Sequence, residues 1–174
     1  GTPVTSILWN TFKNTFVLAL SSIGFALFLG LILGVFSALY KDTLIDKFIL
    51  FFSVLGMSLP SFFSSIIIAW LFGFVLHNYT ALNMTGSLYE VDDYGRGSFL
   101  QIKNLILPAI TLGIRPLSVI IQLCRNSLLE VLSMDYVRTA TAKGLSKFTV
   151  IFKHALHNAL NPVVTAVSGW FASL

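Results

Sequence analysis

Few of the side chains in this sequence are of the types that catalyse reactions or bind metals. His154 and His157 stand three residues apart, which places two imidazoles on one face of a helix, but no third ligand accompanies them. Cys124 is the only cysteine and lies in an apolar stretch, so we expect it to pack and to form no disulfide or thiolate cluster. The sequence has no Ser/His/Asp triad spacing and no GxxxxGK[ST] phosphate loop. We therefore expect no enzymatic activity, no metal and no cofactor bound by this chain.

The composition is typical of a membrane protein. Hydrophobic residues make up 56% of the 174 residues and charged residues only 10%, whereas soluble domains carry about a quarter charged residues. A water-soluble fold of this size could not bury so much apolar surface. The net charge of +4 comes from scattered Lys and Arg, not from the clustered basic patch of a nucleic-acid-binding protein. These features predict an all-α fold, a polytopic transmembrane helical bundle.

Hydrophobic stretches define the expected membrane spans, which are about 14–40, 48–76, 105–129 and, in part, 158–174. The first contains no Asp, Glu, Lys or Arg. As a helix it would be roughly 40 Å long, more than the bilayer core requires. Its Gly24, Gly30 and Gly34 favour close helix packing. The last stretch is too short to cross the membrane and the chain begins without Met, so we expect a single transmembrane domain over 1–174 that is truncated at both ends.

Pro60 interrupts the second stretch. A proline removes one helical hydrogen bond and kinks the helix, and nearby hydroxyls can satisfy the carbonyl that it frees. Ser58 and the serines at 61, 64 and 65 could do so. Pro60 is expected to form a hinge or, more commonly, a static kink.

Lys and Arg are divided unequally between the two sides of these spans. The loop at 78–104 has only two, Arg96 and Lys103, beside the acidic Glu90, Asp92 and Asp93. The other side carries seven: Lys41, Lys47, Arg125, Arg138, Lys143, Lys147 and Lys153. The positive-inside rule therefore predicts that 130–158 is cytoplasmic and that 78–104 is an external loop.

The expected cytoplasmic segment has the pattern of two short helices. Ser133 and Asp135 could cap a helix over 136–143, and Gly144 could adopt a left-handed conformation at its end. Ser146 could cap a second helix, in which positions 148, 151, 152, 155, 156, 159 and 160 form one apolar face. Such a helix could rest on the membrane surface or dock on a cytoplasmic partner, and the pattern alone leaves both open.

The same segment carries a family resemblance. Asp135-Tyr136-Val137-Arg138-Thr139-Ala140-Thr141-Ala142-Lys143-Gly144-Leu145-Ser146, followed by residues 154–164, resembles the EAA loop of binding-protein-dependent ABC importer permeases, in the oligopeptide/dipeptide/nickel branch. Arg138-Thr139-Ala140 replaces Glu-Ala-Ala, and Gly144 keeps its place. The sequence from His154 to His157 stands where Ile-x-Leu-Pro would, and these departures are usual in that branch. Residues 58–63, 107–109 and 125–131 also match and favour the first of two permease subunit types.

The resemblance implies a type I permease core in the bacterial inner membrane that provides a translocation path for peptides or similar solutes. It implies a coupling helix-turn-helix seated on a separate cytoplasmic ATPase subunit, which binds ATP. It also implies a second permease subunit, an extracytoplasmic substrate-binding protein and a lipid surround as partners, and no nucleic acid. The residues expected to contact the ATPase are Asp135, Tyr136, Arg138, Thr139, Ala140, Ala142, Lys143, Gly144, Leu145 and Phe148.

Residues expected to line the path are Arg115, Pro60 and Ser58. A charge within a span costs about 2.5–3.5 kcal/mol on insertion scales and usually faces a partner or a water-filled cavity. Arg115 could therefore attract the carboxylate of a peptide. Alternatively, Pro108 and Pro116 break the helix and let Arg115 extend to an interface, and both readings are open.

Two other kinds of protein remain as alternatives. An ion-gradient-driven transporter would need carboxylates within its spans, and the first two spans contain none. A membrane scaffold would explain the amphipathic helix but not the spans interrupted by proline and glycine. The sequence does not name the solute, which could be a peptide, a nickel chelate or another small molecule.

Overall fold

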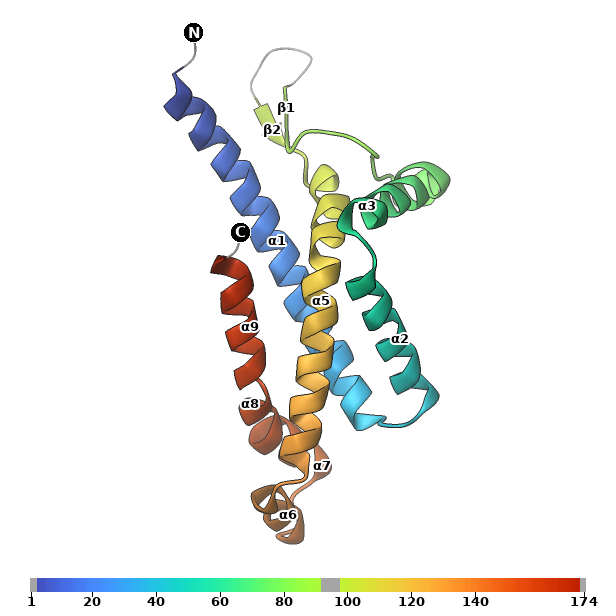
Figure 1. Ribbon diagram of the computed structural model, residues 1–174, viewed down its shortest axis with the longest axis vertical. Helices are drawn as coiled ribbons and strands as arrows, with labels where there is room; N and C mark the ends of the chain where they lie inside the picture. Colours follow the sequence, from blue (N-terminus) through green and yellow to red (C-terminus); the bar gives the residue numbers. More distant parts are fainter. Residues whose placement is uncertain (1–2, 92–97, 173–174) are drawn as a thin grey trace. The chain divides into compact units, whose positions relative to one another are not determined.

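The computed structural model describes residues 3–91 and 98–172 (Figure 1). The predicted all-α class is confirmed, because helices form almost all of the regular structure. One short antiparallel hairpin was not predicted: β1 (Tyr89–Val91) pairs with β2 (Ser98–Leu100), and Tyr89 lies opposite Leu100. The helices are α1 (Val4–Leu39), α2 (Leu44–Ser58), α3 (Ser61–Trp70), the π-helix η1 (Leu71–Val75), α4 (His77–Thr80), α5 (Ile102–Leu132), α6 (Asp135–Ala142), α7 (Lys147–Thr149), the π-helix η2 (Val150–Ala155), α8 (Leu156–Ala159) and α9 (Asn161–Ala172).

In the described part of the chain, α1 and α5 are long and apolar enough to cross a membrane, and α2 with α3 and η1 could form a third, broken span. α1 begins ten residues before the predicted start at 14. The uncharged run begins after Lys13, but the helix extends through this residue toward the N-terminus. The ammonium of Lys13 lies 5.7 Å from the centre of the Trp9 ring. A cation over an aromatic face is stabilised by the ring quadrupole, so this charge is accommodated within the helix.

The second hydrophobic stretch is broken rather than kinked. α2 ends at Ser58 and α3 begins at Ser61, and Pro60 has φ −59° and ψ 138° at the start of α3. The extended ψ explains the break, because a residue with that angle cannot continue the helix that precedes it. Ser58 Oγ donates to Val54 O (2.8 Å) and Ser65 Oγ donates to Phe62 O (2.6 Å). Each hydroxyl therefore forms a hydrogen bond with a carbonyl of its own helix.

Of the two readings left open for the third stretch, the one in which Pro108 and Pro116 break the helix is excluded, since α5 continues through both prolines for 31 residues. A proline removes a single backbone hydrogen bond, which a membrane helix tolerates when its surroundings compensate. At 1.5 Å per residue α5 is about 46 Å long, more than the roughly 30 Å that a bilayer core requires.

The chain divides into two compact units, residues 1–25 with 59–114 and residues 26–58 with 115–174. In the first unit, α5 approaches α1 closely: a Cβ on Gly113 would lie 2.9 Å from the backbone oxygen of Ser22. Amide side chains connect the segment after α4 to the start of α5 in this unit, since Asn83 Nδ2 donates to Asn104 Oδ1 and Asn104 Nδ2 donates to Ser87 O. Asp92, Asp93 and Arg96 of the predicted external loop lie outside the described residues.

The second unit contains the main hydrophobic core. Ala26, Ile120, Cys124 and Leu128 are among its buried members, which confirms the packing role of Cys124. Glycines let α1 and α5 approach each other here: a Cβ on Gly30 would lie 2.6 Å from Ile120 Cγ2, and one on Gly34 2.7 Å from Cys124 Cβ. The same prediction for Gly24 is wrong, because nothing lies within 4 Å of a Cβ at that position.

Candidate functional site

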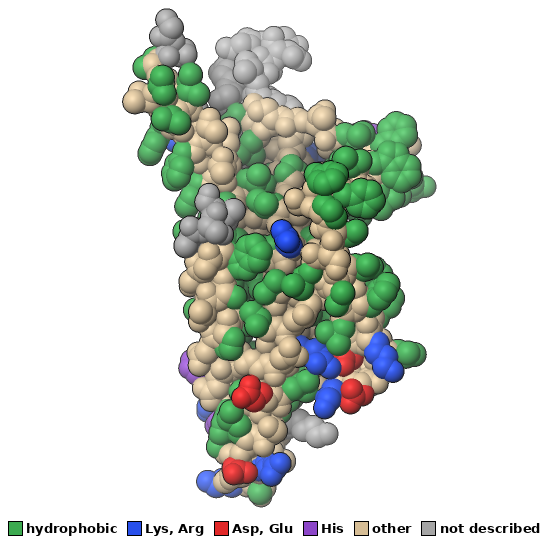
Figure 2. Space-filling view, in the orientation of Figure 1, with side chains coloured by type: hydrophobic (Ala, Val, Ile, Leu, Met, Phe, Trp, Pro, Cys, Tyr) green, Lys and Arg blue, Asp and Glu red, His purple; other side chains and the backbone are tan. Residues whose placement is uncertain are grey.

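α6, α7 and α8 gather at the C-terminal end of α5, all within the second unit (Figure 1). Figure 2 shows charged side chains over α6 and over the turn between α1 and α2, whereas the coloured side chains elsewhere in this view are mostly hydrophobic. α6 covers Asp135–Ala142, one residue earlier than predicted. The predicted caps are wrong: Met134 is the N-cap residue and no side chain caps α6, Ser133 Oγ donates to Glu130 O (2.6 Å), and Asp135 lies within the first turn.

The turn after α6 has the predicted geometry. Gly144 has φ +81°, the left-handed conformation that glycine adopts without a Cβ penalty. Its N–H donates to Thr141 O (3.0 Å), and the next N–H, of Leu145, lies 3.4 Å from Ala140 O. Ser146 caps the following helix as predicted, because its Oγ accepts the N–H of Thr149 (3.2 Å). The reversal of the chain at Gly144 is therefore well specified.

The predicted single apolar face of the second helix is wrong. Val150 and Ala155 are buried, whereas Phe148 is 69% exposed and Phe152 46% exposed. The cause is η2, because the i→i+5 bonding of a π-helix adds a residue to the turn and rotates the residues before it onto another face. The two phenyl rings lie 4.4 Å apart and form an exposed aromatic pair.

Most residues predicted to contact an ATPase are accessible. Ala140 is the exception, since it is 9% exposed and packs, with Val137, in the core around Leu128. The hydroxyl of Tyr136 has an internal partner as well, because Asn158 Nδ2 donates to it (2.9 Å). The residues that remain exposed are Asp135, Tyr136, Arg138, Thr139, Ala142, Lys143, Gly144, Leu145 and Phe148.

A shallow hollow of about 400 Å³ lies against α6. It is lined by Leu132, Val137, Arg138, Thr141 and Ala142. Arg138 also lies 3.7 Å from Asp135 in an exposed ion pair, and exposed pairs of this kind contribute little to stability. The guanidinium is therefore able to exchange Asp135 for another carboxylate at low cost.

The three predicted path residues are divided between the two units: Pro60 belongs to the first, Ser58 and Arg115 to the second. Arg115 is exposed on α5 and forms no ion pair with any residue that the structure describes. A path lined by all three stays a prediction. No group of three potential metal ligands occurs among the described residues, and His77 bonds through Nδ1 to Leu82 O (2.7 Å).

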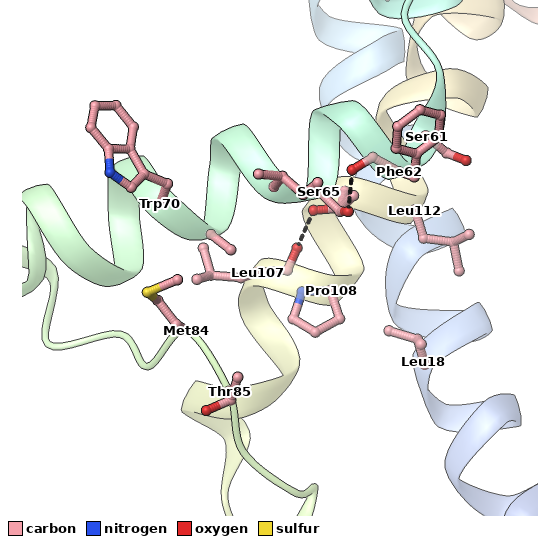
Figure 3. A pocket seen from close by; sticks show the side chains of 13 residues that line it. Leu18, Ser61, Phe62, Ser65, Trp70, Met84, Thr85, Leu107, Pro108 and Leu112 are labelled. Atoms are coloured by element: carbon pink, nitrogen blue, oxygen red, sulfur yellow. Dashed lines mark hydrogen bonds between the residues drawn. The ribbon is translucent and has the colours of Figure 1, made fainter.

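The first unit contains an apolar groove of about 750 Å³ (Figure 3). Its lining includes Phe62 and Trp70 of α3 and Leu107 and Pro108 of α5, together with Met84. Two of the hydroxyls that border it donate to carbonyls of their own helices, Ser65 to Phe62 O and Thr111 to Leu107 O (2.8 Å). None of the described residues that line the groove is charged.

Sequence reasoning missed a buried ion pair in the second unit. Arg125 Nε donates to Asp46 Oδ1 (2.8 Å) and Arg125 Nη2 donates to Asp46 Oδ2 (2.7 Å). Ser37 Oγ donates to Asp46 Oδ1 (2.5 Å), and the N–H of Asp42 donates to Oδ2 (3.0 Å). The side chain of Asp46 is 3% exposed and that of Arg125 14%. The positive-inside pattern assigns Arg125 to the cytoplasmic charges, and its place in an apolar stretch is the signal that it needs a partner.

Comparison with known proteins places these features in a family. Residues 30–173 match the model of the binding-protein-dependent transport system inner membrane component. The di/tripeptide transport system permease protein DppB of Pseudomonas aeruginosa is 41% identical over 88% of this chain and 50% of its own length. The dipeptide transport system permease protein DppB of Bacillus subtilis is 35% identical over 98% of this chain and 51% of its length.

The name of a third relative refers to a different solute. The putrescine export system permease protein SapB of Escherichia coli is 30% identical over all of this chain and 59% of its own length. This chain spans about half the length of the two DppB relatives. Because the family model covers most of the chain, the chain belongs to the family of inner membrane components of binding-protein-dependent transport systems.

Proposed function

We propose that this chain is part of the permease subunit of an ATP-driven peptide importer. The single observation that carries the proposal is the α6–Gly144–α7 reversal, an exposed and tightly specified helical turn at the end of a membrane-crossing helix. The names of two relatives support peptides as the solute. The name of the third keeps polyamine export as the second candidate.

The exposed face of α6 provides the chemistry for docking on a cytoplasmic ATPase subunit. Arg138 and Lys143 present cations that can pair with carboxylates of the partner. The hollow beside Ala142 accepts an apolar side chain, and Phe148 adds exposed aromatic area, which is enriched in protein interfaces. This surface forms the coupling segment, defined as residues 135–148.

The mechanism follows from how the coupling segment is attached. ATP binding closes the two ATPase subunits and moves their coupling segments toward each other, and rigid helices carry this movement into the membrane. Alternating access then opens the translocation path to one side at a time. An extracytoplasmic binding protein delivers the solute, and a second permease subunit completes the path.

Reconstitution tests the proposal. The full-length permease, its partner permease, the ATPase subunits and the binding protein encoded with them are placed in liposomes with a radiolabelled dipeptide outside and ATP inside. We expect uptake that requires both ATP and the binding protein. ATP-dependent transport of putrescine without uptake of dipeptides would favour the second candidate, and uptake driven by an ion gradient without ATP would exclude both.

A further inference from the structure

Polar contacts attach α2 to its unit. Only two of its side chains are buried, and both are polar: Asp46 and Ser53 are each 2% exposed. Large apolar side chains of the same helix, among them Phe48 and Phe51, are exposed. Ile49 and Leu50 are partly buried and no large apolar side chain of α2 is fully buried, so hydrogen bonds and an ion pair provide its specific attachments.

The first attachment is the Asp46–Arg125 pair. The guanidinium donates to both carboxylate oxygens in a bidentate arrangement. This geometry fixes the orientation of such pairs and also strengthens them. Ser37 of α1 and the backbone N–H of Asp42 donate to the same carboxylate. One side chain of α2 therefore ties together the end of α1, the α1–α2 turn and α5.

The second attachment lies two turns further along α2. Ser53 Oγ donates to the backbone oxygen of Ser118 (2.9 Å), and Gln122 Nε2 donates to Ser53 Oγ (3.1 Å). Positions 118, 122 and 125 follow one another at four and three residues, so they share one face of α5. α2 is thus held to a single face of α5 at two points.

α5 connects these attachments to the coupling segment. Arg125 stands seven residues, about two turns, before the end of α5 at Leu132, and α6 begins at Asp135. Val137 and Ala140 of α6 are buried in the same cluster as Leu128 and Val131 of α5. A displacement of α6 therefore moves the end of α5, and the hydrogen-bonded helix carries it to Arg125.

We propose that Asp46 and Arg125 are positioning residues for transport, the joint through which movement of the coupling segment reaches α2. This inference rests on the proposed function, since it needs an ATPase that moves α6. Packed elements and polar networks are the physical routes by which such coupling travels. Without the ion pair α5 would move past α2, and ATP would be hydrolysed without a matching rearrangement of the second span.

Arg125→Lys in the complete reconstituted importer is the test. Lysine keeps the charge but cannot form both hydrogen bonds of the guanidinium fork. At equal amounts of folded complex, we expect dipeptide transported per ATP hydrolysed to fall at least threefold while the ATPase rate is retained. Lys47→Arg, the reverse exchange on the exposed neighbour of Asp46, is the matched control and should keep the wild-type ratio.

The ratio separates coupling from stability, because a pair that only supports the fold would lower the melting temperature and leave the ratio unchanged. An unchanged ratio in Arg125→Lys would overturn the proposal. If that variant does not fold, Ser37→Ala decides, since it removes one hydrogen bond to the Asp46 carboxylate without burying an unpaired charge. A lower ratio in Ser37→Ala supports the joint and an unchanged one refutes it, while uptake by the wild-type importer tests the proposed function separately.

Discussion

Leucine at Gly34 should strongly destabilise the folded protein, whereas leucine at Gly24 should not. A Cβ at position 34 would lie 2.7 Å from Cys124 Cβ and 3.0 Å from the backbone oxygen of Ile121. Neither is the flexible end of a side chain, so α1 and α5 must separate to admit the new group. Overpacking costs about 1–3 kcal/mol, occasionally more, and the backbone contact places Gly34→Leu at the upper end.

Thermal unfolding of the full-length protein in detergent, followed by tryptophan fluorescence and size-exclusion chromatography, measures this difference. Gly24→Leu is the matched control, because it makes the same exchange in the same helix where nothing lies within 4 Å. Equal melting temperatures for the two variants would show that the close approach of α1 to α5 at Gly34 does not exist.

Arg115→Leu should weaken transport of peptides that carry a free C-terminal carboxylate. Arg115 stands ten residues, about 15 Å, along α5 from Arg125. If the Asp46–Arg125 pair marks the cytoplasmic edge of a roughly 30 Å core, Arg115 lies near mid-membrane, too deep for its side chain to reach an interface. Because the helix is unbroken at Pro116, an aqueous path is the better explanation for this exposed charge.

Dipeptide uptake by the reconstituted importer measures how strongly Arg115→Leu weakens transport. A hydrogen bond to a charged group contributes about 1.5–3 kcal/mol, so we expect the apparent KM of a free dipeptide to rise about tenfold or more. Uptake of the C-terminally amidated dipeptide should change little, and Arg115→Lys should retain most of the preference. If the leucine variant transports both peptides as the wild type does, Arg115 has no role in the path.

The helical class was predictable because long apolar runs without Asp, Glu, Lys or Arg indicate membrane-spanning helices. The turn at Gly144 was predictable for a similar reason, since a glycine followed by a capping serine is a local signal. The apolar face of the helix that follows Gly144 was not predictable. A 3.6-residue period assumes α-helical bonding, and the π-helix η2 exposes Phe148 and buries Val150.

Contacts between distant parts of the chain could not be read from local pattern. Gly30 and Gly34 pack against α5 and Gly24 does not, although all three stand in one apolar helix. Ala140 resembles the exposed residues around it, but it faces the end of α5. The Asp46–Arg125 pair joins residues 79 positions apart, and the sequence shows only that Arg125, in an apolar stretch, needs a partner.

Site-directed cross-linking tests the central claim, that residues 135–148 dock on an ATPase. A cysteine is placed at the exposed Ala142 of the full-length protein in a Cys124→Ser background, which removes the one cysteine of this chain. After treatment with a bifunctional reagent in native membranes, we expect a covalent adduct with an ATPase subunit whose yield changes with nucleotide. Complete labelling of Ala142→Cys without any ATPase adduct, with or without ATP, would contradict the proposed function.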